Sequence, residues 1–202
     1  LMKHKILEAM RLAEQDRRLD GRVEIDDAYL GGEFSGGSTG RGADNKVPFV
    51  AAVQTTAAGH PVYTCLQPQP PTSQAMVEFA DAHLGASTVV VSDGLRCFMA
   101  VTQRGIRHER TLVRPNVHGR AACVKLAQFR AVNTLLGNPK NAINGTYHAF
   151  NFAKYAHRYL AEFQFRFNRR FDMTTILNSL LASLLAAPPS PELWLRTAEV
   201  AR

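Results

Sequence analysis

Apolar residues in the first half of the chain follow the alternating and short continuous patterns of β-strands. The stretch VEIDDAYL, residues 23–30, has the apolar residues of a strand with three acids among them, and VVVSDG carries a short apolar run of the fully buried kind. Turn residues such as AAGH separate neighbouring runs. The ranges predicted as strands or strand-containing stretches are 23–30, 48–56, 61–67, 87–94 and 106–113.

Helical spacing dominates the remainder of the chain. Residues 3–19 show an amphipathic helical pattern, and a second helix is expected after Pro70-Pro71 with Thr72 or Ser73 as its N-cap. A helix over 95–105 closes at a glycine, and residues from about 120 to 186 are mainly helical. The glycine-rich stretch 31–46 lacks the spacing of a phosphate-binding loop and is expected to be a flexible hairpin connection.

The resulting order is three strands, a helix, a strand, a helix, a strand and then helices. It resembles a ribonuclease-H-like domain, an α/β fold with a mixed sheet and flanking helices. In such a sheet the first and fourth strands are neighbours, so Asp26 in the first strand would face Asp93 at the end of the fourth. Oxygen ligands from two strands suit Mg²⁺. The alternative is a half-exposed edge strand whose acids bind no metal.

The first predicted strand carries three acidic residues, Glu24, Asp26 and Asp27, whose side chains lie on both faces of the strand. Asp26 and Asp27 point to opposite faces, so only one of them can reach Asp93. Glu24 shares the face of Asp26 and is expected to position the metal ligands without binding the metal itself. The other reading makes Glu24 and Asp27 solvent-exposed or ion-paired residues.

Charge is distributed unevenly along the chain. The net charge is +7, but residues 1–94 hold 8 Lys and Arg against 12 acids, whereas residues 95–170 hold 14 Lys and Arg against 2 acids. A segment with this excess of basic residues favours a nucleic-acid partner over a membrane. The alternative is a basic surface that only keeps the protein soluble.

Composition excludes several other classes. The sequence shows no apolar run of membrane-spanning length and no signal peptide at its N-terminus. Its 3 cysteines are far apart and form no zinc ribbon or disulfide framework. We therefore expect a protein of a reducing cytoplasm that is not associated with a membrane.

Four motifs carry a family resemblance over residues 20–172. They are VEIDDAYLGG, VVVSDG, VNTLLGNPKNAINGTYH and RYLAEFQFRFNRRFD. Together they resemble the DDE superfamily of insertion-sequence transposases, in the branch whose third acid is replaced by Asn and followed by Lys. The resemblance implies that Asp26, Asp93 and Asn133 hold Mg²⁺ or Mn²⁺, with Lys140 as a fourth catalytic residue.

The same resemblance implies a reaction and partners. Two metal ions would activate water to cut at the transposon end, and the freed 3′-OH would attack target DNA in line. Double-stranded DNA is the expected partner, with a homo-oligomer assembled on it. The resemblance also implies a bacterial protein associated with the nucleoid. Glu162 is the alternative third acid, because it is one of only two acids in residues 95–170.

Several residues are expected to contact DNA phosphates or line the DNA path. They are Arg41, Lys46, His148, Arg158, Arg166, Arg169 and Arg170. The aromatic stripe along 151–171 is predicted to pack in the core and not to stack on bases.

Three domain segments are expected: the end of an N-terminal helical region at 1–20, the catalytic domain at 21–172 and a helical tail at 173–202. Relatives of this branch carry a zinc-ribbon region before the catalytic domain, so we expect a catalytic domain cut from a longer protein, or a truncated relic. Two other functions remain open: a different ribonuclease-H-like nuclease such as a junction resolvase, and an inactive relic that only binds DNA.

Overall fold

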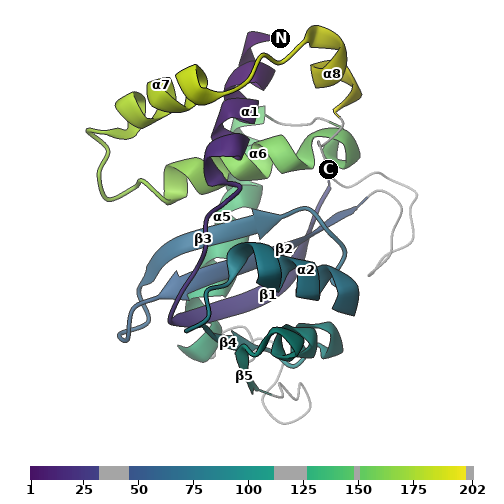
Figure 1. The fold of residues 1–202 in the computed structure, drawn as a ribbon, viewed down its shortest axis with the longest axis vertical. Helices are drawn as coiled ribbons and strands as arrows, with labels where there is room; N and C mark the ends of the chain where they lie inside the picture. The colour runs from purple at the N-terminus through teal and green to yellow at the C-terminus, as the bar shows by residue number, and fades with distance from the viewer. Residues whose placement is uncertain (32–45, 112–126, 148–150, 199–202) are drawn as a thin grey trace.

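The computed structural model describes residues 1–31, 46–111, 127–147 and 151–198. Its centre is a five-stranded mixed sheet in the order β3-β2-β1-β4-β5 (Figure 1). Strands β1, β2 and β3 are antiparallel, whereas β4 and β5 run parallel to β1. The bounds are β1 Arg22–Leu30, β2 Val47–Thr55, β3 Pro61–Gln67, β4 Val89–Ser92 and β5 Arg107–Arg110.

Helices flank the sheet on both faces. Helix α2 and the 3-10 helix η1 cover one face, and α5 lies behind the other face, with α1, α6, α7 and α8 stacked at one side (Figure 1). The bounds are α1 Met2–Glu14, α2 Ser73–His83, η1 Arg96–Arg104, η2 Ala127–Phe129, α5 Arg130–Tyr147, α6 Phe152–Phe167, α7 Ile176–Ala186 and α8 Glu192–Thr197.

Alternation along β1 supplies both halves of the core. Val23 and Ile25 pack with α2 and η1, whereas Ala28 and Leu30 pack with α5 and α6. This is the two-sided burial expected of a central strand in a mixed sheet. The predicted α/β fold with a ribonuclease-H-like mixed sheet is confirmed.

Several element boundaries and types differ from the predictions for local reasons. The first helix ends at Glu14 and not at residue 19, because Leu19 joins a parallel bridge with Leu84. Strand β4 ends at Ser92, and Gly94 follows with a φ of 92°, a left-handed turn that glycine tolerates. The segment before Gly105 is a 3-10 helix, although Gly105 closes it as predicted with a φ of 73°.

Cap and core predictions for two other helices are confirmed. Thr72 caps α2 by accepting a hydrogen bond from the backbone N–H of Ala75. Along α6, Tyr159 is buried in the core, and the other rings of the predicted stripe pack against the same cluster. These other rings belong to Phe152, Tyr155, Phe163 and Phe167.

Two buried ion clusters join α1 to α6, and we call this contact the α1–α6 interface. Glu8 accepts hydrogen bonds from Arg11 and from Arg158, whose side chain is 0% exposed. Glu14 binds Arg17 and Arg169 and also accepts from the Asn168 amide. Despite its burial, the pKa of Glu14 is lowered, because these hydrogen bonds outweigh the cost of desolvation.

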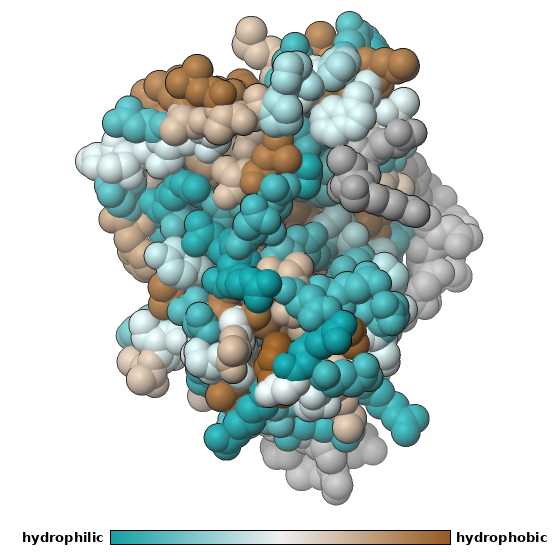
Figure 2. Space-filling view, in the orientation of Figure 1, coloured by the Kyte–Doolittle hydropathy of each residue, from teal (hydrophilic) through white to brown (hydrophobic). Residues whose placement is uncertain are grey.

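Helix α7 presents an apolar surface to solvent. Leu177, Leu181 and Leu185 are exposed at four-residue spacing, and Figure 2 shows a hydrophobic patch over this helix at the upper left. In the described part of the chain, no helix combines the length and apolarity needed to cross a membrane.

Candidate active site

The register of β1 and β4 brings two carboxylates together. Their parallel ladder pairs Ile25 with Ser92, and the next residue on each chain is Asp26 and Asp93. Strand alternation places Asp26 on the face of Ala28, which α5 covers, whereas Asp93 lies just beyond the end of β4. The neighbouring strands predicted from the sequence are therefore present, and the two aspartates each follow the last residue pair of the ladder.

Asp27 lies on the opposite face of the same strand. It shares that face with Ile25, beneath η1, and is only 9% exposed. Burial raises the pKa of the Cys97 thiol, and the negative charges of Asp27 and, less strongly, Asp93 raise it further. Asp26 therefore faces α5, whereas Asp27 faces the side of the sheet that α2 and η1 cover.

Glu24 ties the start of α5 to β1. Its Oε2 accepts a hydrogen bond of 2.9 Å from the backbone N–H of Val132, and its Oε1 accepts one of 2.6 Å from Arg22. Arg22 also donates to the carbonyl of Gln128 at 2.8 Å. Since Asn133 follows Val132 directly, this anchor holds the turn of α5 that carries Asn133 against β1. Glu24 is therefore buried and ion-paired with Arg22, as the other reading of this residue allowed.

Asn133 and Lys140 lie on one side of α5. Seven residues separate them, which is about two turns of an α-helix, and the helix continues through Pro139. Both side chains are half-buried. The predicted shared helix face is thus present in the structure.

Local hydrogen bonds orient the two carboxylates. Asp26 Oδ1 accepts from the backbone N–H of Asp27 at 2.8 Å, and Asp93 Oδ1 accepts from that of Leu95 at 3.1 Å. Both side chains are half-buried, so they remain open to a ligand from solvent. Among the described residues, no three His, Cys, Asp or Glu side chains gather as a metal-binding group. The set proposed from the sequence takes an amide as its third member.

The structure changes the interpretation of the arginines at the end of α6. Arg158 is fully buried, and it donates to Glu8 and to the carbonyl of Leu195. A contact between Arg158 and DNA is incompatible with this burial, so that expectation is corrected. Arg169 binds Glu14 and lies on the ring of Phe165. Its main contacts are therefore internal.

Arg170 and Arg166 differ in how much of the side chain reaches solvent. Arg170 donates to the carbonyls of Val62 and Pro61 in β3, so it holds α6 against the sheet. Arg166 pairs with Glu162 but remains half-exposed, which leaves it able to contact DNA. Glu162, the alternative third acid, is occupied by this ion pair.

Three other predicted DNA contacts lie near or beyond the described residues. Lys46 precedes β2, whose Val47 pairs with Leu30, so it lies about five strand residues past Asp26, or about 17 Å. Arg41 and His148 lie outside the described residues.

Three exposed arginines near the carboxylates were not singled out from the sequence. Arg96 begins η1 three residues after Asp93, and Arg110 lies beside Ser92 in β5. Arg130 begins α5, one turn before Asn133. All three are exposed. Only the excess of basic residues after residue 94 signalled them, because their grouping depends on the strand order.

Comparison with known families assigns the chain to one of them. The family model of the ISXO2-like transposase domain matches residues 18–168. Neither curated proteins nor solved structures gave a match. The matched range includes the whole sheet, both aspartates and α5, and such a family implies DNA as a partner and nuclease or polynucleotidyl-transferase chemistry. The chain belongs to the ISXO2-like transposase domain family.

Proposed function

We propose that this transposase domain cuts DNA at the ends of an insertion sequence and joins the freed 3′ ends to target DNA. The observation that supports the proposal is the β1–β4 register, in which Asp26 and Asp93 each follow the last pair of the ladder, Ile25 and Ser92. A homo-oligomer on DNA belongs to the same proposal, since two transposon ends need two active sites.

The donor set supports Mg²⁺ or Mn²⁺ as the cofactor. Asp26, Asp93 and the Asn133 amide offer oxygen atoms, which these hard cations prefer over nitrogen or sulfur. When bound there, the metal would supply positive charge beside the scissile phosphate and lower the pKa of a bound water. Asn133 contributes an oxygen but no negative charge, so the set carries two charges in place of three.

The chain's own residues would position the DNA. Lys140 lies two turns beyond Asn133 on the same helix side, where its ammonium would contact a phosphate next to the scissile bond. Arg96, Arg110 and Arg130 would hold the DNA backbone around the carboxylates. Glu24 would keep α5 at a fixed distance from β1 through its bond to Val132.

A DNA-binding relic without catalysis is the second candidate. The observation that favours it is Asn133, because a site with one negative charge fewer binds divalent cations more weakly. It predicts that the DNA affinity remains while cleavage is lost.

The test uses a duplex that carries the end of the protein's own insertion sequence. The active domain should nick this duplex when Mg²⁺ or Mn²⁺ is added and should join the nicked strand to a second duplex. EDTA should abolish both products without abolishing binding. Tight binding with no product at any metal concentration would support the relic and overturn the catalytic proposal.

A further inference from the structure

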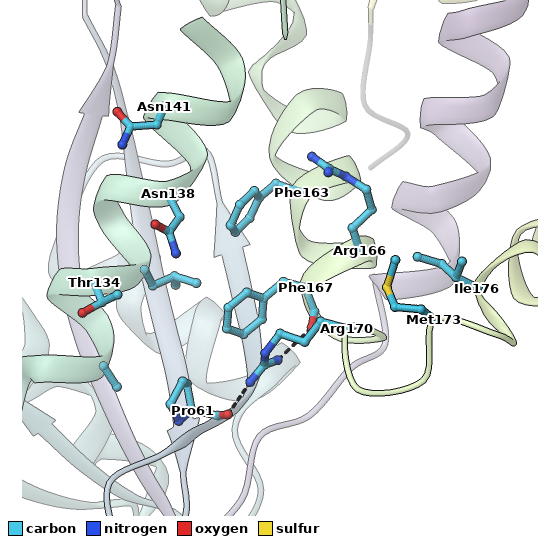
Figure 3. A pocket seen from close by; sticks show the side chains of 12 residues that line it. Pro61, Thr134, Asn138, Asn141, Phe163, Arg166, Phe167, Arg170, Met173 and Ile176 are labelled. Carbon is cyan, nitrogen blue, oxygen red and sulfur yellow. Dashed lines mark hydrogen bonds between the residues drawn. The ribbon is translucent and has the colours of Figure 1, made fainter. Parts of the chain in front are cut away.

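A cavity separates α5 from α6, and we call it the α5–α6 pocket. It encloses about 640 Å³, within the 300–1,000 Å³ usual for sites that bind small molecules. Thr134, Asn138 and Asn141 line it from α5, and Phe163, Phe167 and Arg166 line it from α6. In Figure 3 the two phenylalanine rings point from α6 toward α5, and the Asn138 amide projects into the same space.

This pocket lies beside the candidate active site but on the other flank of α5. Successive residues of a helix are turned by about 100°, so Thr134, Asn138 and Asn141 point roughly 80–140° away from Asn133. A helix with its side chains is about 10–12 Å across. The pocket and the carboxylates are thus separated by about the width of one helix.

The floor and walls of the pocket are held in place. Arg170 bonds to the carbonyls of Pro61 and Phe167, which fixes the end of α6 against β3. The rings of Phe163 and Phe167 stack on each other with centroids 5.9 Å apart. An aromatic wall of this kind is present before any ligand binds, so a flat ligand loses little free energy in ordering it.

We infer that the α5–α6 pocket binds one unpaired nucleobase of the DNA substrate, an inference that rests on the proposed function. The phenylalanine rings offer faces on which a base can stack. The Asn138 amide has both a donor and an acceptor, which match the edge of a base. Arg166, half-exposed at the rim, is placed for the phosphate of the same nucleotide.

A base fits the lining better than an aliphatic side chain from a protein partner. Leucine or isoleucine would cover the phenylalanine rings but would bury the Asn138 amide without a hydrogen bond, which is costly. Arg170 also lines the pocket and donates to backbone carbonyls, so its positive charge favours a polyanion. The charge and the polar groups together select nucleic acid as the occupant.

The geometry sets where along the strand this base would lie. With about 3.4 Å per nucleotide, the width of α5 corresponds to roughly three nucleotides from the phosphate at the carboxylates. Only a base that has left the duplex can enter the pocket. The inference therefore concerns a frayed or extruded base close to the cut.

Binding and photocrosslinking without divalent metal test the inference independently of cleavage. The probes are a short single strand and a forked duplex, each with 5-iododeoxyuridine at the unpaired positions, and a fully paired duplex. Crosslinks should map to Phe163 or Phe167. Phe163→Leu, which keeps apolar volume but removes one ring, should weaken single-strand binding about 5- to 100-fold and lose its crosslink.

Asn138→Ala should also weaken single-strand binding while leaving the paired duplex unaffected. Its matched control is Asn178→Ala on α7, another exposed helical asparagine, which should change neither affinity. Alanine is the better helix former at both positions, so the variants should fold. Circular dichroism and thermal melting verify this for each protein.

Three outcomes would overturn the inference. If the crosslinks avoid α6, or if Asn138→Ala and Phe163→Leu bind single strands like the parent, no base occupies the pocket even though the proposed function can stand. If these variants instead change the oligomeric state by light scattering, the pocket holds a protein segment. If the parent binds none of the three probes, the proposed function fails with it.

Discussion

The α1–α6 interface and the candidate active site use the same residue types in opposite ways. At the interface, Glu8 and Arg158 are almost fully buried and bind each other. At the site, Asp26 and Asp93 stay half-buried, and the two like charges follow the last residue pair of neighbouring strands. In the first region opposite charges cancel within the fold, whereas in the second a bound cation would cancel them.

This contrast shows why charge alone does not identify a functional residue. Arg158 and Arg130 both belong to the basic half of the sequence. Arg158 is enclosed between helices, whereas Arg130 is exposed at the start of α5. A buried charge is retained only with its partner, because losing that partner leaves an uncompensated charge in a low-dielectric interior.

The largest effect is expected from removing a carboxylate of the site. Asp26→Asn or Asp93→Asn should lower metal-dependent cleavage by about 1,000-fold or more, since the metal supplies several kcal/mol of transition-state stabilisation. The thermal midpoint without metal should stay the same or rise slightly, because one of two repelling charges is gone. Full cleavage by either variant would remove that aspartate from the site.

Breaking the buried ion pair between Glu8 and Arg158 should instead lower the free energy of unfolding. Glu8→Ala leaves Arg158 unpaired in the interior and should reduce the free energy of unfolding by about 3–5 kcal/mol. Urea titration measures this loss. The matched control is Glu192→Ala, which breaks the exposed pair with Arg196 and should cost about 0–1 kcal/mol. Equal losses for the two variants would contradict the contrast between the two regions.

Substituting Lys140 should lower the cleavage rate more than the affinity for duplex DNA. If its ammonium contacts the phosphate beside the scissile bond, Lys140→Ala should lower the cleavage rate by about 100-fold. Its effect on duplex affinity should stay within a factor of about ten.

Asn133→Glu should strengthen metal binding, because it adds a negative charge to the set. A metal dependence unaffected by Asn133→Ala and Asn133→Glu would exclude Asn133 from the site.

Salt dependence should distinguish the exposed arginines from the internal ones. Neutralising Arg96, Arg110 or Arg130 to Gln should lower the slope of log affinity against log salt by about one unit for each phosphate that the protein no longer neutralises. Arg170→Gln should leave the slope unchanged but lower the thermal midpoint, because its contacts are to carbonyls of β3. Fluorescence anisotropy at several salt concentrations measures the slopes.

The smallest effect concerns His157 at the α1–α6 interface. Burial, and then the charge of Arg158, lower the pKa of His157 to about 4. Between this value and the unfolded pKa near 6.5, the unfolded chain binds a proton that the folded chain does not. Stability should therefore fall as pH decreases from about 6.5 to 4.

Urea midpoints at pH 7 and pH 5 test this dependence. Arg11, Glu8 and His4 also act on His157, and His4 has a lowered pKa of its own. His157→Leu should therefore reduce the difference between the two midpoints without removing it. A difference equal to that of the parent would show that His157 does not carry the dependence.

Local sequence patterns were sufficient to predict much of the molecule. The apolar residues of 23–30 predicted β1, and the Thr72 cap predicted the start of α2, because both signals depend on neighbouring residues alone. The order of strands and helices indicated that the first and fourth strands are adjacent. Asp26 and Asp93 could accordingly be singled out from this order, whereas Asn133 and Lys140 were named only from the family resemblance.

What the tertiary structure decided was the environment of each charge. The sequence could not distinguish Arg158 from Arg130, or show that Glu24 anchors Val132 across 108 residues. It also gave no sign of the α5–α6 pocket, which forms only where two helices meet β3. The periodic patterns of helices and strands depend on residues a few positions apart, so they can be recognised in the sequence alone. Burial and ion pairing join residues distant along the chain, so only the packed structure assigns them.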